Sequence, residues 1–155
     1  MKNYAQGNIK FKISINTSRF FMNEKTLASL LGAMLECGYD DYTFNGFSNE
    51  KGESVGGSTS HKNGYNGDLR FLRKDKSGKG VYLNKISEDG DPCGWKGMDE
   101  ARQNKFNDAL FRFGWKSMLC SYYTGKLLNN CTADEDHYDH LHVQSYTPDF
   151  KEVKE

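Results

Sequence analysis

Three of the four histidines in this 155-residue chain lie within six residues of one another, at His137, His140 and His142. The fourth, His61, stands far upstream. Because imidazole binds metals and exchanges protons near neutral pH, this clustering indicates a metal or acid–base site. If His140 and His142 lie on one strand, the two-residue period directs both side chains to the same face. His137 then reaches that site from the turn before the strand.

A second element places His61 and Asp68 seven positions apart across a glycine-bearing turn. Zinc binds both imidazole and carboxylate, and catalytic zinc has three protein ligands and one open position. We therefore predict that His61, Asp68 and one of the downstream histidines hold Zn²⁺, which leaves the other histidines to carry protons or stabilise charge. The plainer interpretation is a solvated polar loop and an edge strand whose histidines are incidental.

Residues 59–68 (TSHKNGYNGD), followed by residues 137–143 (HYDHLHV), resemble the zinc peptidases that cut bacterial cell-wall peptides. This group contains lysostaphin-type enzymes, D-alanyl-D-alanine carboxypeptidases and the hedgehog signalling domain, and its signature is Ser-x-His-x(6)-Asp followed by His-x-His on a strand. The second segment is most similar to penicillin-insensitive murein endopeptidases. The D-alanyl-D-alanine carboxypeptidase and phage endolysin branch shares the first motif. Thr59 replaces the usual serine and Asn66 a small residue, and neither change removes a ligand.

The resemblance implies a role for each residue of the two motifs. His61, Asp68 and His142 would ligate zinc, His140 would be the catalytic base or oxyanion stabiliser, and His137 would be an auxiliary active-site histidine. A zinc-activated water would then attack a peptide carbonyl, and a histidine would protonate the leaving amine.

The resemblance implies a peptidoglycan peptidase, either an endopeptidase or a carboxypeptidase, that hydrolyses stem peptides or cross-links. The alternative from another class is a non-catalytic zinc-containing domain of the same fold that binds a wall fragment or a protein partner. A metal-dependent nuclease is a third interpretation. Its nucleic-acid substrate is disfavoured because 21 basic and 21 acidic residues give no net charge, whereas phosphate binding normally requires a basic surface.

The substrate of such an enzyme lies in the cell wall or periplasm, yet the first residues contain no apolar stretch typical of a secretory signal. We therefore expect delivery by a route other than the general secretory one, as an antibacterial toxin, or release as a phage lysin; truncation of a longer protein is the third option. A delivered toxin predicts an immunity protein as a partner. No run of 18 apolar residues is present, so we expect no membrane span.

The length suits one domain covering residues 1–155. None of the four cysteines forms a C-x-x-C pair. We expect mostly buried free thiols, with a disulfide as the alternative.

Periodicity predicts the elements that position the site. Helices are expected over residues 24–37, between Asn23 and Gly38, and from Asp99 to about Gly114. The expected apolar stripe of the first is Leu27, Leu30, Leu31, Met34 and Leu35, and that of the second is Ala101, Phe106, Ala109, Leu110 and Phe113. The expected strands cover residues 9–15, 42–47, 68–72, 115–123 and 140–146.

Strands that do not alternate regularly with helices favour an α+β domain with a small, mostly antiparallel sheet, flanking helices and the zinc site on the sheet. Long polar loops at residues 48–67 and 74–97 would flank a cleft. Five aromatic residues could line a substrate groove, but we favour ordinary core or surface packing for each of them: Tyr65, Trp95, Trp115, Tyr122 and Tyr123. Solvation is likewise favoured over substrate binding for Arg70 and Arg73.

Overall fold

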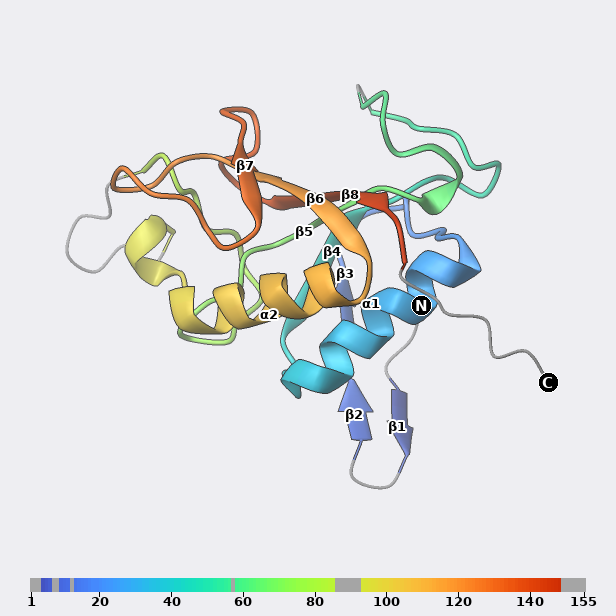
Figure 1. Cartoon of the computed structure of the whole chain (residues 1–155), viewed down its shortest axis with the longest axis horizontal. Helices are drawn as coiled ribbons and strands as arrows, with labels where there is room; N and C mark the ends of the chain where they lie inside the picture. The colour runs from blue at the N-terminus through green and yellow to red at the C-terminus, as the bar shows by residue number, and fades with distance from the viewer. Residues whose placement is uncertain (1–3, 7–8, 12, 57, 86–92, 149–155) are drawn as a thin grey trace.

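The computed structural model describes residues 4–6, 9–11, 13–56, 58–85 and 93–148 (Figure 1). Within these residues the chain forms an α+β fold with two α-helices, two short 3₁₀ turns and two sheets. The helices are α1 (Glu24–Cys37) and α2 (Glu100–Arg112). The strands are β1 (Tyr4–Gln6), β2 (Ile9–Phe11), β3 (Ile13–Ile15), β4 (Tyr42–Gly46), β5 (Gly67–Leu69), β6 (Trp115–Cys120), β7 (Cys131–Ala133) and β8 (Leu141–Tyr146).

The main sheet has six strands in the order β3-β4-β5-β8-β6-β7 and is mixed. The prediction of a mostly antiparallel sheet is therefore wrong. The three central pairings are antiparallel, but β3 pairs with β4 in parallel, and so does β6 with β7. In both cases the segment between the paired strands returns the chain to the edge of the sheet where the first strand began, so the second strand runs in the same direction. Helix α1 lies in the first of these crossover connections.

Both α-helices begin and end at signals that the sequence carries. The Asn23 side chain accepts a hydrogen bond from the Lys25 N–H at the start of α1, and Gly38 ends it in the left-handed conformation (φ 70°). The Asp99 side chain accepts from the Arg102 N–H at the start of α2. The predicted bounds of both helices are confirmed to within two residues.

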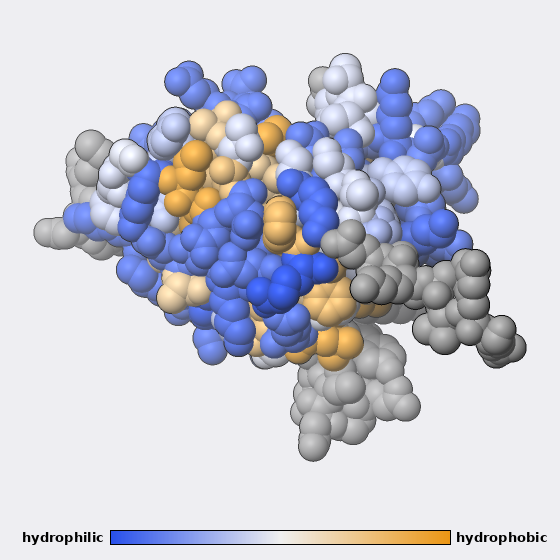
Figure 2. Space-filling view, viewed as in Figure 1, coloured by the Kyte–Doolittle hydropathy of each residue, from blue (hydrophilic) through white to orange (hydrophobic). Residues whose placement is uncertain are grey.

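The two α-helices lie side by side against one face of the six-stranded sheet (Figure 1). Leu30, Met34 and Leu110 are fully buried there. The predicted stripes were too wide, because Leu35 is 46% exposed and Phe113 37% exposed, and Ala101 is exposed as well. The view in Figure 2 shows a mostly hydrophilic surface, with apolar side chains between the polar ones.

Strand bounds were predicted less well than helix bounds. The alternating segment at residues 9–15 contributes β2 to a two-stranded sheet with β1, and β3 to the six-stranded sheet; residue 12 lies outside the described residues. The strand expected at 115–123 ends at Cys120, and the one expected at 68–72 is the three-residue β5. An alternating apolar pattern indicates which residues share a face of the sheet, but not where the hydrogen-bonded pairing with a neighbouring strand ends.

All four cysteines are free thiols, and Cys37 and Cys120 are buried. Neither helix of the described residues has the length and apolar character needed to cross a membrane.

Candidate metal centre

Asp68 and His142 are placed opposite each other by the pairing of the two central strands. Asp68 on β5 is the register partner of His142 on β8. Their side chains meet, with the carboxylate Oδ1 2.8 Å from the imidazole Nδ1. Leu141 and Val143, the neighbours of His142, are fully buried. Because side chains alternate along a strand, the histidine lies on the sheet face opposite the helices.

His61 reaches the same point from the loop that precedes β5. It stands directly before a 3₁₀ turn, Lys62–Gly64, whose last residue has φ 68°. The Gly64 carbonyl accepts hydrogen bonds from the Asn23 N–H and the Thr26 hydroxyl. A Cβ on Gly64 would lie 2.4 Å from the Asn23 nitrogen, so only glycine permits this contact. The start of α1 therefore anchors the loop that carries His61.

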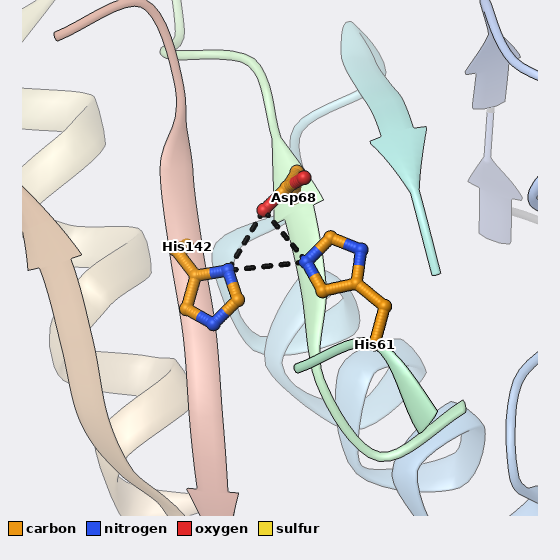
Figure 3. A group of neighbouring side chains, drawn as sticks. All are labelled: His61, Asp68 and His142. Carbon is orange, nitrogen blue, oxygen red and sulfur yellow. Dashed lines mark hydrogen bonds and ion pairs between the residues drawn. The ribbon is translucent and has the colours of Figure 1, made fainter. Parts of the chain in front are cut away.

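These three side chains, His61, Asp68 and His142, form a buried group that can hold a metal ion (Figure 3). His61 Nε2 lies 3.2 Å from the carboxylate Oδ1 and 3.3 Å from His142 Nδ1. Ligands bound at about 2.1 Å to a tetrahedral metal lie about 3.4 Å apart. Two of the three separations match this spacing, and the third, at 2.8 Å, is shorter. Two imidazoles and one carboxylate also suit a divalent cation chemically, so the donor set fits.

His140 and His137 adjoin this group of three side chains. His140 Nε2 is 3.4 Å from Asp68 Oδ1, and its Nδ1 is 2.6 Å from the Asp139 carboxylate. The His137 ring centroid lies 4.9 Å from that of His140, and its Nδ1 is 2.9 Å from Asp134 Oδ1. This contact with His137 lowers the pKa of the Asp134 carboxyl. Each of these two histidines is thus held by an aspartate from its own segment.

Three of the four histidines stabilise a charged carboxylate at Asp68. Burial by itself raises the pKa of this carboxyl, but hydrogen bonds from His142 and His61 and the charge of His140 outweigh burial. The net effect holds the pKa well below its usual range. Asp68 is therefore a carboxylate near neutral pH, which is the form that binds a metal ion.

Sequence reasoning missed Arg19, which lies between β3 and α1. Its Nη2 is 3.9 Å from Asp68 Oδ2, and its Nη1 is 3.4 Å from His61 Nδ1. The guanidinium passes directly over Gly46, where a Cβ would lie 2.6 Å from Nη2. Nothing in the spacing of the sequence marks this arginine.

The site opens into a pocket with a volume of about 570 Å³, a size typical of small-molecule sites. Its lining residues are Arg19, Gly56, Ser58, Thr59, Ser60, His61, Asp68, Asp136, His137, His140 and His142. Asn66 does not line it; its side-chain amide donates to the Ser60 carbonyl and braces the loop.

The five candidate groove aromatics also lie outside this pocket. Trp115 and Tyr123 are buried in the core, as the packing interpretation predicts. Arg73 is 2% exposed and its side chain bonds Asp75 and the Gly80 carbonyl, so the expected solvation of this arginine is wrong. Arg70 bonds Asn45, so neither arginine contributes to this site.

No protein-family model matches this chain, and searches of curated proteins and of solved structures return no significant match.

Proposed function

We propose that this chain is a zinc-dependent peptidase that hydrolyses the peptides of bacterial peptidoglycan. The observation that carries the proposal is the meeting of His61, Asp68 and His142 in one buried triangle, with His140 Nε2 3.4 Å from the shared carboxylate oxygen. A two-histidine, one-carboxylate set leaves an open position on a tetrahedral ion, which is typical of catalytic rather than structural zinc. The substrate class comes from the resemblance of residues 59–68 and 137–143 to cell-wall peptidases.

Zinc bound by these three residues would acidify a water molecule and polarise a peptide carbonyl. His140 would accept a proton at Nε2; its contact with Asp68 and its position in the pocket lining support this role. His137 is the second proton carrier and contacts the His140 ring. The Arg19 guanidinium adds positive charge on the other side of Asp68, where it would stabilise developing negative charge on substrate.

The proposal is tested by incubating the zinc-loaded protein with purified peptidoglycan and identifying the fragments by mass spectrometry. We expect new peptide fragments whose masses identify the bond that is cut. His142→Ala removes one ligand and should abolish them, whereas Glu135→Ala, an exposed change outside the pocket, should not. Unchanged fragments with zinc-loaded wild type would overturn the proposal.

Such a peptidase acts where the peptidoglycan is, so we also propose delivery of this chain to the cell wall or periplasm, as a toxin or lysin. Directing the wild-type chain to the periplasm of a test bacterium should lyse the cells, and the His142→Ala chain should not. A toxin would further be neutralised by an immunity protein from the producing cell. Intact cells despite confirmed periplasmic expression of the wild type would contradict this proposal.

A further inference from the structure

His140 is held from both sides by carboxylates. Its Nδ1 lies 2.6 Å from Asp139 Oδ1, while Nε2 lies 3.4 Å from Asp68 Oδ1. A neutral imidazole has one N–H donor and one acceptor nitrogen, and the partner of one nitrogen decides the state of the other. The shorter contact is to Asp139, so the proton of the neutral ring belongs on Nδ1.

We infer that Asp139 is a positioning residue, which holds His140 as the Nδ1–H tautomer with an unprotonated Nε2 directed into the pocket. The opposite tautomer would place a proton on the nitrogen that faces Asp68, and that nitrogen could then accept none. The catalytic consequence rests on the proposed function. The tautomer itself does not, because it follows from the contact between two neighbouring side chains.

The exposure of Asp139 indicates that it acts mainly by orienting the His140 ring rather than through the effect of its negative charge. The side chain is 42% exposed, whereas that of His140 is 20% exposed, and water screens the charge of an exposed carboxylate. His140 directly precedes β8, so its backbone is fixed at one end by the strand. The Asp139 carboxylate then fixes the ring at the other end.

Three variants separate orientation from charge. Asp139→Asn keeps a carbonyl oxygen that accepts from Nδ1–H but loses the charge, and Asp139→Ala loses both. Glu135→Ala is the matched control, because it removes one negative charge from the same segment, is exposed and lies outside the pocket-lining residues.

The first measurement is the protonation of each histidine nitrogen, read from long-range ¹H–¹⁵N correlation spectra of ¹⁵N-histidine-labelled protein. Spectra are taken at mildly alkaline pH with and without one equivalent of zinc, and His140→Gln assigns the signals. We expect a protonated Nδ1 at His140 in wild type, Asp139→Asn and Glu135→Ala, and its loss in Asp139→Ala. An unprotonated Nδ1 in wild type, or a protonated one in Asp139→Ala, overturns the inference.

The second measurement is turnover of the peptidoglycan peptide by the zinc-loaded protein. Asp139→Ala should lower kcat about 10- to 100-fold, with KM and zinc affinity unchanged, and Asp139→Asn should restore most of the rate. Active wild type together with unchanged kcat in Asp139→Ala overturns the catalytic role of Asp139 but not the proposed function. Inactive wild type overturns the proposed function and the catalytic role, and the spectra still decide the tautomer.

Discussion

Asp68 and His142 occupy directly opposite positions on β5 and β8, and their side chains meet at 2.8 Å. This pair is fixed by the register of two central strands rather than by a loop. A slip of one residue would turn one of the two side chains to the other face of the sheet. The buried neighbours Leu141 and Val143 oppose such a slip, so the core holds two of the three candidate ligands in place.

Replacing Asp68 with asparagine should remove metal binding without changing the shape of the site. The carboxylate oxygen contacts both His61 and His142, and an amide oxygen is a much weaker ligand. We expect zinc affinity to fall by more than the roughly 10- to 100-fold loss that is usual for outer-shell partners. Isothermal titration calorimetry measures this, with Asp75→Asn as the control for an aspartate remote from the pocket. Equal affinity in Asp68→Asn and wild type would exclude Asp68 as a ligand.

Gly46→Ala should displace Arg19 from the pocket while leaving the fold intact. The new Cβ would lie 2.6 Å from Arg19 Nη2, and the end of a long side chain can move away from it. We expect kcat/KM to fall as far as it does in Arg19→Ala, with less than about 1 kcal/mol lost in the free energy of unfolding. If Arg19→Ala is impaired and Gly46→Ala is fully active, the position of the Arg19 guanidinium in the pocket does not require the absence of a side chain at residue 46.

Gly67→Ala should destabilise the protein, because β5 begins against the ring of Phe47. A Cβ there would lie 2.1 Å from Phe47 Cε1, and Phe47 is 1% exposed, so neither group has room to move. Overpacking of this kind costs about 1–3 kcal/mol, measured by urea denaturation. Phe47→Leu should reduce the cost of the added methyl group, because contacting sites are not additive. Simple additivity of the two changes would show that the clash is relieved elsewhere.

Acid should weaken the protein in part through Asp75. The hydrogen bonds from Arg73 come first among the causes that hold the pKa of the Asp75 carboxyl well below its usual range. The unfolded chain binds this proton near pH 3.9, before the folded one does. The stabilisation is therefore fully present above about pH 5 and is lost as the pH falls further.

Asp75→Asn tests this pH dependence. It should lower the urea midpoint at neutral pH, and the difference from wild type should shrink near pH 3. A difference that stayed constant over this range would mean that the carboxylate charge is not the source of the stabilisation.

The sequence alone predicted the helices well, because caps such as Asn23 and Gly38 and the helical apolar spacing are local features. It also predicted that His61, Asp68 and one of the downstream histidines form a metal site, and the resemblance to cell-wall peptidases singled out His142. The structure confirms that these three side chains form a group that can hold a metal ion. The identity of the ion as zinc and the peptidase activity stay predictions.

Only the tertiary structure decided the directions of the outer strands and the residues around the ligands. Strand direction depends on how α1 and the segment before β7 return the chain, which no alternating pattern records. Arg19 reaches the pocket because β4 lies beside β3 and has glycine at position 46, and that proximity exists only after the sheet is assembled. Short motifs and their resemblance therefore predicted the candidate ligands, whereas contacts between segments far apart in the chain determined the charges that surround them.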